Sequence, residues 1–185
     1  MTSDAHVISL ARTARESALG LLYETYRGKI YTFLLRISGD ADVADDLTQD
    51  TFIKAYRAFE SLGEGHRLLP WLYRIATNAA IDASRRRKRL VWVPILTLTD
   101  RRDEPQARDE HIGVSERDHI NRTLRELPVE NVAALLLHAL EGYSYREIAE
   151  IEGVSLTAVR SRIARARMAF KDAYATIPAA RSSSE

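Results

Sequence analysis

The stretch SYREIAEIEGVSLTAVRSRIARARM, residues 144–168, decides the fold of the C-terminal part of the chain. Ser144 and Glu147 have the spacing of a capping box, so a short helix is expected to begin here. Gly153 can end that helix in a left-handed conformation, and Ser155 can cap a second helix directly after it. Two helices joined by a tight glycine turn predict a helix-turn-helix.

The second of these helices, which is expected to extend to about Tyr174, separates apolar from basic residues. Its apolar stripe recurs at steps of four, three and four residues: Val159, Ile163, Ala166 and Phe170. Residues 155–171 include several arginines and no Asp or Glu. Such a helix can place its first residues against base edges in the major groove while its arginines hold phosphates. A basic helix without a role in DNA binding is the alternative, but the caps and glycine turn at this spacing favour DNA binding.

The N-terminal half reads with helical period and contains few glycine or proline residues. Breaks are expected at Gly28 and at Gly39. Asp40 can cap one helix, and Pro70 suits the first turn of another. The helices expected in this half cover residues 17–26, 30–37, about 41–59 and about 71–88.

The helix expected at residues 71–88 has two distinct faces. One is apolar and consists of Leu72, Ile75, Ala76, Ala79 and Ala83. The other mixes an aromatic ring, an amide and charges, and consists of Trp71, Arg74, Asn78, Asp82 and Arg85. Aromatic side chains beside a basic run such as residues 85–89 are typical of single-stranded DNA binding, and Asn can read a base edge. From these residues alone, a core tryptophan and a basic run that complements the helix dipole are almost as well supported.

The helix expected at residues 41–59 begins with many carboxylates: Asp42, Asp45, Asp46 and Asp50. An acidic first turn is ordinary helix chemistry. This many carboxylates on a chain with two basic runs nonetheless indicates that this surface faces a protein rather than phosphates.

Composition narrows the functional classes. The 185 residues carry a net charge of +1 and include no cysteine, which excludes disulfides and thiol catalysis and fits a reducing cytosol. We find no signal peptide and no apolar run near the roughly 20 residues of a spanning helix, so we expect a cytoplasmic protein without a membrane contact of its own. No phosphate loop or hydrolase motif occurs, and the histidines are scattered, so we expect no enzyme, catalytic residue, metal or cofactor.

We expect an all-α fold of two small helical domains. Between them lies the apolar stretch LVWVPILTL, residues 90–98, followed by a charged stretch, and together these predict a linker that docks on a domain or is covered by a partner. Two further helices, at residues 115–126 and 129–141, precede the helix-turn-helix and are separated by Leu127-Pro128. The expected boundaries are an N-terminal domain at 1–92, a linker at 93–114, a C-terminal domain at 115–177 and a flexible tail at 178–185.

Several motifs resemble those of extracytoplasmic-function sigma factors, the small sigma factors of bacterial RNA polymerase. DLTQDTF at 46–52, WLYRIATN at 71–78 and the basic run at 85–89 resemble region two of that family. The region-four resemblance rests on LP at 127–128, LLL at 135–137, GYSYREIA at 142–149, GVS at 153–155 and VRSRIARAR at 159–167. The resemblance covers about residues 17–173 in order and in spacing, which makes it specific.

The resemblance implies a role for each surface. Contact with core RNA polymerase would fall on Asp46, Leu47, Gln49, Asp50 and Phe52. Recognition and melting of the minus-ten promoter element would fall on Trp71, Tyr73, Asn78, Asp82, Arg85 and Arg86. The minus-thirty-five element would be read by Ser155, Thr157, Arg160, Ser161 and Arg165. Core RNA polymerase and promoter DNA are thus the expected partners, and an anti-sigma factor is a further candidate because one is common in this family.

Leu68-Leu69-Pro70 departs from the aromatic and polar residues that many members carry at these positions, which puts the minus-ten base preference in doubt. A stand-alone helix-turn-helix regulator that binds duplex DNA without polymerase is the alternative function. The N-terminal half counts against it, because that half shows neither a phosphoacceptor pattern nor a ligand-binding β domain.

Overall fold

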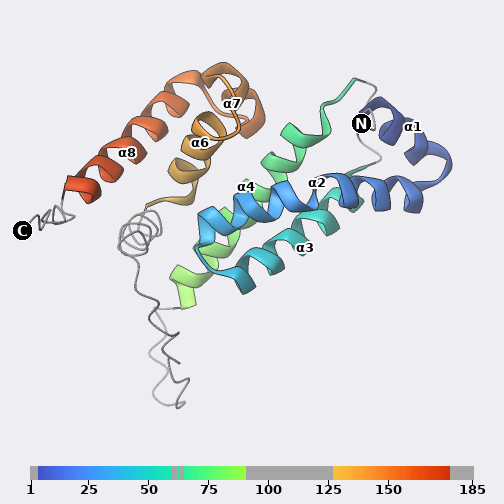
Figure 1. The fold of residues 1–185 in the computed structure, drawn as a ribbon, viewed down its shortest axis with the longest axis horizontal. Coiled ribbons are helices and arrows are strands. Elements are labelled where there is room, and N and C mark those ends of the chain that lie inside the picture. The colour runs from blue at the N-terminus through green and yellow to red at the C-terminus, as the bar shows by residue number, and fades with distance from the viewer. Residues whose placement is uncertain (1–3, 60–61, 63–64, 91–126, 176–185) are drawn as a thin grey trace, which may run out of the picture.

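The computed structural model describes residues 4–59, 62, 65–90 and 127–175, and these fold into seven α-helices with no strand among them (Figure 1). Four helices come from the N-terminal half: α1 (Asp4–Thr13), α2 (Arg15–Ser38), α3 (Ala41–Ala58) and α4 (Leu68–Leu90). Three come from the C-terminal half: α6 (Val129–Ala139), α7 (Tyr145–Glu152) and α8 (Leu156–Ala175). This confirms the expected all-α fold. The expected linker, the helix at 115–126 and the tail at 178–185 lie outside the described residues.

The predicted break at Gly28 is wrong, because α2 continues through it as a single helix of 24 residues. A glycine inside a helix costs about 1 kcal/mol relative to alanine. Burial of Leu22 and Ile30 on either side of Gly28 outweighs that cost. The predicted end at Gly39 is confirmed: its φ is 64°, and its N–H donates to the Leu35 carbonyl.

The first four helices pack around an apolar core that positions α3 and α4. Asp40 caps α3 as expected, since its Oδ1 accepts a hydrogen bond from the Val43 N–H at 3.0 Å. α4 begins at Leu68, three residues before its predicted start, so Pro70 lies inside the first turn, where its missing N–H does no harm. Fully buried side chains from α2 and α4 meet in this core: Leu22, Ile30, Leu34, Leu68 and Leu72.

The C-terminal half forms a smaller bundle in which α6 packs against both α7 and α8. α6 ends at Ala139, two residues before the predicted Glu141, and Gly142 takes a φ of 76° in the turn that follows. The predicted apolar stripe of α8 is confirmed at Val159, Ile163 and Ala166, which are almost completely buried, whereas its fourth member, Phe170, is only partly buried.

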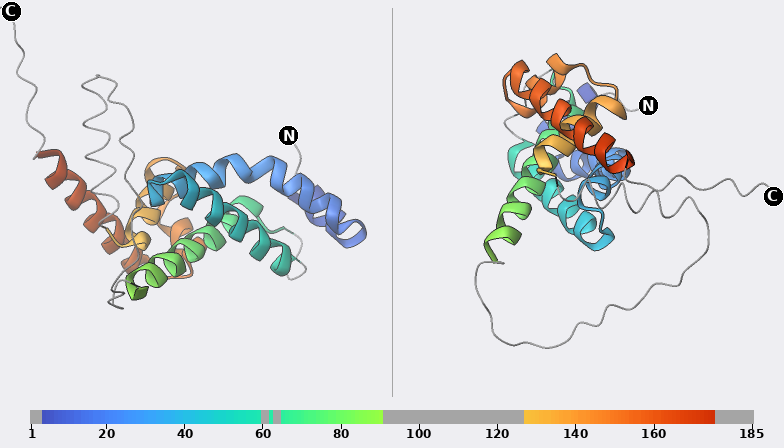
Figure 2. Two further views of the ribbon diagram at one scale, coloured as in Figure 1. Left: turned by 90° about the horizontal axis from the view of Figure 1, so that it is seen from below. Right: turned by 90° about the vertical axis from the view of Figure 1, so that its left-hand side faces the viewer.

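The two halves contact each other directly. α6 lies between α8 and the N-terminal helices, as Figures 1 and 2 show, and it contacts both α2 and α4. α7 packs on α4. At this junction the rings of Tyr73 and Tyr143 meet edge to face with centroids 6.1 Å apart. The described residues therefore form one closed arrangement in which α7 covers part of α4.

Candidate nucleic-acid and polymerase interfaces

The helix-turn-helix geometry follows from the caps that the sequence predicts. Ser144 Oγ accepts from the Glu147 N–H at 3.3 Å, while Glu147 Oε2 accepts from the Ser144 N–H at 2.9 Å. Gly153 ends α7 with a φ of 67°. Ser155 Oγ then accepts from the Ala158 N–H at 3.2 Å, which starts α8 in a new direction.

The outer face of α8 carries the residues expected at the minus-thirty-five element. Its polar residues are exposed and point away from the core: Ser155, Thr157, Arg160, Ser161 and Arg165. Because the opposite face is buried, these side chains share one accessible surface that is free of carboxylates. We call this set the α8 surface.

An ion pair that the sequence did not reveal connects α7 and α8. Arg162 donates to Glu152 Oε2, and the two side chains are only 22% and 2% exposed, respectively. Burial raises the pKa of Glu152, and the Arg162 guanidinium opposes that rise. Arg162 therefore joins α8 to α7, unlike the exposed arginines of the α8 surface. The two residues are ten positions apart across a turn, so no helical spacing signals the pair.

The polar face of α4 is exposed as expected at Arg74, Asn78, Asp82, Arg85 and Arg86. Trp71 is half-buried, with its ring 6.0 Å from that of Phe59, so the indole contacts the core and remains partly accessible. These residues, without Tyr73, form what we call the α4 surface.

Tyr73 is the exception among the expected minus-ten residues, because the structure places it in the core with 0% exposure. It packs against Phe33 at 4.9 Å, and burial raises its pKa, with the nearby Glu141 carboxylate adding to the rise. Positions 73, 76, 77 and 80 lie on one helical face, and all four are buried. The structure therefore does not bring Tyr73 together with the exposed residues of α4.

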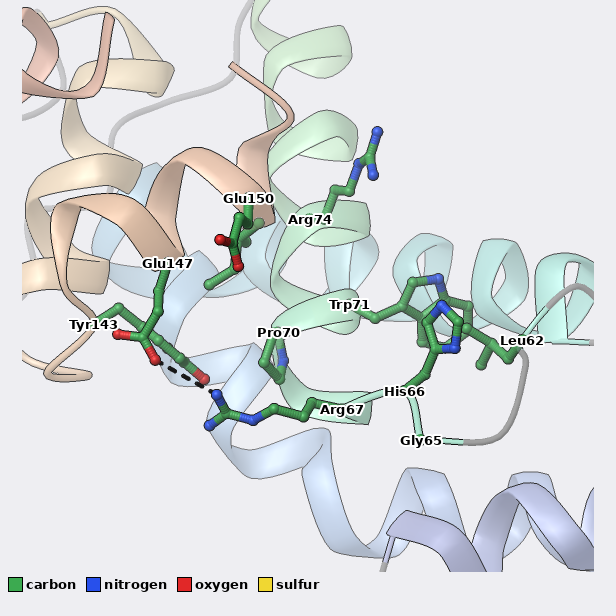
Figure 3. A pocket seen from close by; sticks show the side chains of 11 residues that line it. Leu62, Gly65, His66, Arg67, Pro70, Trp71, Arg74, Tyr143, Glu147 and Glu150 are labelled. Atoms are coloured by element: carbon green, nitrogen blue, oxygen red, sulfur yellow. Dashed lines mark ion pairs between the residues drawn. The ribbon is translucent and has the colours of Figure 1, made fainter. Parts of the chain in front are cut away.

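A cleft of about 610 Å³ separates the start of α4 from α7 (Figure 3). Trp71 and Arg74 line it from α4, and Glu147 and Glu150 line it from α7. Arg67 Nη1 lies 3.5 Å from Glu147 Oε1 across this cleft. Carboxylates of α7 thus face the part of α4 that is expected to meet DNA, and the closed arrangement limits access to it.

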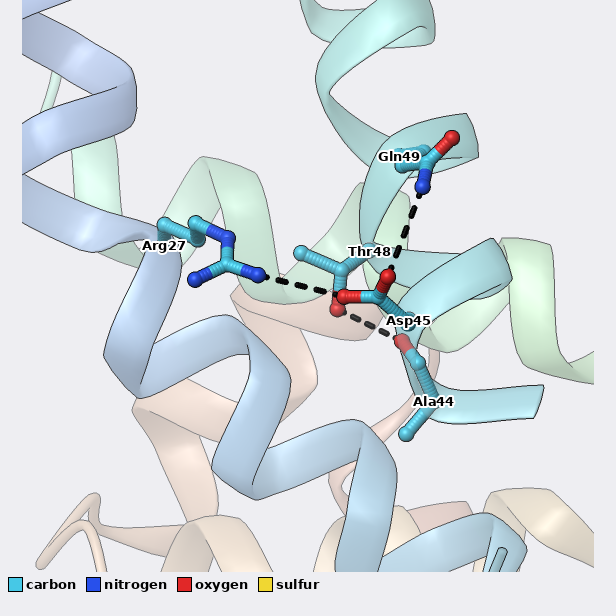
Figure 4. Close-up of polar contacts among 5 residues, drawn as sticks. All are labelled: Arg27, Ala44, Asp45, Thr48 and Gln49. Carbon is cyan, nitrogen blue, oxygen red and sulfur yellow. Dashed lines mark hydrogen bonds and ion pairs between the residues drawn. The ribbon is translucent and has the colours of Figure 1, made fainter. Parts of the chain in front are cut away.

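α3 presents a mixed acidic and apolar surface. Asp45 is held by Arg27 at 3.2 Å and approached by the Gln49 amide at 3.5 Å (Figure 4). Asp50 pairs with Lys54 at 2.9 Å. Asp46 and Gln49 are exposed. This surface has both paired and exposed polar groups and can bind a protein partner.

The remaining two expected polymerase contacts on α3 are less accessible. Leu47 is only 6% exposed and belongs to the core, while Phe52 is half-buried with its ring 4.9 Å from that of Tyr23. Sequence reasoning missed the large apolar side chains beside them: Tyr23, Ile53 and Tyr56 are 39%, 50% and 43% exposed. Tyr23 lies on the neighbouring helix α2, whereas Ile53 and Tyr56 lie on α3 outside its row of buried residues at 44, 47, 51 and 55, which could have indicated their exposure. Together with Asp46, Gln49, Asp50 and Phe52 they form the α3 surface.

Among the described residues, no group of three or more His, Asp or Glu side chains could hold a metal ion. Across the same residues, none of the helices is long and apolar enough to cross a membrane.

Comparison with known proteins matches each half of the chain to a region of the sigma-70 family. The family model for sigma-70 region 2 matches residues 22–90, and that for sigma-70 region 4 matches residues 117–170. The ECF RNA polymerase sigma-E factor of Salmonella typhimurium is 33% identical over 177 residues, which cover 91% of this chain and 92% of that relative. The ECF RNA polymerase sigma factor SigE of Mycolicibacterium smegmatis is 36% identical over 82% of this chain, which spans 59% of that longer relative.

Solved structures agree with this assignment. The sigma factor RpoE of Bartonella quintana, crystallised with the anti-sigma factor NepR, matches with a TM-score of 0.63 and 25% identity over 85% of this chain and 97% of RpoE. CnrH, solved with the cytosolic domain of CnrY, shares the fold with a TM-score of 0.66 at 23% identity, over 93% of this chain and 97% of CnrH. The chain therefore belongs to the ECF family of RNA polymerase sigma factors, and its function is that of a promoter-directing sigma factor.

Proposed function

We propose that the chain divides this function among its three surfaces. The α3 surface binds core RNA polymerase, the α4 surface recognises and melts the minus-ten element, and the α8 surface reads the minus-thirty-five element. The domains at 1–92 and 115–177 carry these tasks, and the chain acts in the cytoplasm as an initiation factor rather than an enzyme. The proposal is supported above all by the exposure of Asn78 and the α4 arginines on a helix that also carries the partly accessible indole of Trp71.

The closed arrangement implies that the chain must open in order to work. The two promoter elements are separated by roughly 25 base pairs, or roughly 85 Å of duplex at 3.4 Å per step. Here α7 and α4 are in contact, and a Cβ added at Gly153 would lie 3.2 Å from Arg74 Nη2. We infer that binding to polymerase separates the two halves. An anti-sigma factor, such as the one in the RpoE complex, would keep the chain from polymerase.

The polymerase contact is tested by two neighbouring substitutions on α3. Gln49→Ala removes an exposed amide, so we expect weaker binding to core polymerase and an unchanged free energy of unfolding. Leu47→Ala empties a core position and should cost about 3 kcal/mol of stability, whatever it does to binding. The measurements are gel filtration with core polymerase and urea unfolding of the free chain.

Failure of the wild-type chain to co-elute with core polymerase, combined with a shift of duplex DNA by the chain alone, would refute the proposed α3 contact. The stand-alone regulator would then be the better account.

The α8 surface is tested by two of its arginines. Arg160 lies in the first turns of α8, where base edges are within reach, so Arg160→Ala should cost about 2 kcal/mol of promoter affinity and relax sequence preference. Arg165 lies further along α8. Arg165→Ala should therefore weaken binding to all DNA sequences alike and reduce the dependence of log affinity on log salt concentration by about one. Binding of polymerase with the chain to promoter fragments at several salt concentrations measures both. Equal effects of the two substitutions on all sequences would contradict base reading by Arg160.

A further inference from the structure

The start of α4 is held by a carboxylate from the beginning of the chain. Leu68, the first residue of α4, donates its N–H to Asp4 Oδ2 at 3.0 Å. The other oxygen of this carboxylate, Oδ1, accepts from the Tyr26 hydroxyl at 2.5 Å. Asp4 is the first residue of α1, and Tyr26 lies in the middle of α2. One side chain therefore ties three helices together at the point where α4 begins.

The side chains of Arg67 and of the first turn of α4, Leu68 to Trp71, cannot accept a hydrogen bond, so none of them can cap the helix. Its first turn contains no acidic residue. The residue before it is Arg67, whose guanidinium cannot accept a hydrogen bond and is unfavourable at the positive end of a helix. The Trp71 N–H reaches the Arg67 carbonyl only at 3.4 Å. Asp4 thus supplies, from 64 positions earlier, the acceptor and negative charge that an N-cap residue normally provides.

The position of Asp4 is itself well defined. Val7 and Ile8 of α1 are 2% and 4% exposed, so docking of α1 on the core fixes where its first residue lies. Burial and the hydrogen bond to Asp4 raise the pKa of Tyr26 to about 12, so its hydroxyl remains a donor at neutral pH. The link between α1, α2 and α4 is therefore rigid from both sides.

We propose that Asp4 is a positioning residue for promoter opening: it fixes the first turn of α4 and thereby the indole of Trp71 on the α4 surface. The inference rests on the proposed role of that surface. Trp71 follows Leu68 by three residues, almost one helical turn, so fraying of this turn would release the indole from Phe59. A contact that is not held in place in advance must be ordered when DNA binds, which weakens the binding.

The test compares Asp4→Ala with Asp4→Asn. Alanine removes both hydrogen bonds, whereas the asparagine oxygen can accept from the Leu68 N–H and its NH₂ can donate to the Tyr26 oxygen. Glu24→Ala is the matched control, because it removes one carboxylate from an exposed position of α2. The three readouts are amide exchange of Leu68, Leu69 and Trp71, affinity for core polymerase, and opening of promoter DNA at saturating polymerase. Opening is followed by 2-aminopurine fluorescence. The promoter is one that the wild-type chain with polymerase selects from a randomised DNA pool.

We expect Asp4→Ala to speed amide exchange at Leu68, Leu69 and Trp71 and to lower promoter opening by about fivefold, the effect of one lost helix cap of typical strength. Its affinity for core polymerase should not change, and Asp4→Asn and Glu24→Ala should behave like the wild type. If Asp4→Ala does not fold, Tyr26→Phe is used in its place. This substitution removes only the hydrogen bond between Tyr26 and Asp4, so the fall in promoter opening should be smaller.

Two outcomes would overturn the proposal. One is normal promoter opening by Asp4→Ala, and the other is a loss of opening that merely parallels a loss of polymerase affinity or folded protein. A wild-type chain that opens no DNA would instead refute the role of the α4 surface, and amide exchange would then decide separately whether Asp4 caps α4.

Discussion

Asn78→Ala should reduce promoter opening by roughly 30-fold, which corresponds to about 2 kcal/mol, the usual strength of an amide contact to a base edge. Asn78 is exposed in the middle of the α4 surface, so its removal leaves no cavity and should not change the free energy of unfolding. The measurement is 2-aminopurine fluorescence of promoter DNA with polymerase and either form of the chain.

Gln49→Ala is the matched control for this experiment, because it removes an exposed amide from α3 instead of α4. The two substitutions should show opposite patterns: Asn78→Ala keeps polymerase affinity and loses opening, and Gln49→Ala loses affinity but opens DNA normally once polymerase is saturating. An Asn78→Ala chain that opens DNA as well as the wild type would exclude Asn78 from the minus-ten contact.

Arg162→Ala should destabilise the C-terminal bundle by about 3 kcal/mol, the usual cost of breaking a buried ion pair by removing one partner. The Glu152 carboxylate, only 2% exposed, would then be buried without its cation. The pKa of Glu152 in the folded chain already lies above its unfolded value of 4.5 and should rise further. The stabilising effect of a raised pKa is present below the unfolded pKa and is lost as pH rises through the folded pKa.

The loss in free energy of unfolding caused by Arg162→Ala should therefore be smaller at about pH 5 than at about pH 8, because a neutral carboxyl costs less to bury than a carboxylate. Urea unfolding at both pH values measures it. Arg165→Ala is the control: it removes an exposed arginine from the same helix and should change stability by no more than about 0.5 kcal/mol at either pH. Equal destabilisation by both substitutions would show that the buried pair has no special role.

Local signals predicted most of the fold. The capping box at Ser144, the glycine at 153 and the apolar stripe of α8 each depend on residues within one or two turns, and all three are confirmed. The predicted break at Gly28 is wrong because it depends on contacts that are not local. Its cost is local, but the burial that outweighs it comes from packing against other helices, which helical period alone does not show.

The candidate site shows the same limit. Exposure of the α8 residues and of Asn78 follows from the faces read in the sequence. The core position of Tyr73 does not, because the resemblance marks a motif without distinguishing its packing residues from its contacting ones. The contacts of Asp4 with Leu68 and of Arg67 with Glu147 join distant segments, so no spacing in the sequence predicts them.

Selection from a randomised DNA pool by core polymerase and the purified chain tests most directly that one sigma factor uses two separate DNA-reading surfaces. The selected sequences should share two elements at a fixed separation of roughly 25 base pairs, roughly 85 Å. Arg160→Ala should reduce sequence preference only in the upstream element, and Asn78→Ala should reduce it only in the downstream element. A single element, or the same element selected by the chain without polymerase, would contradict the account.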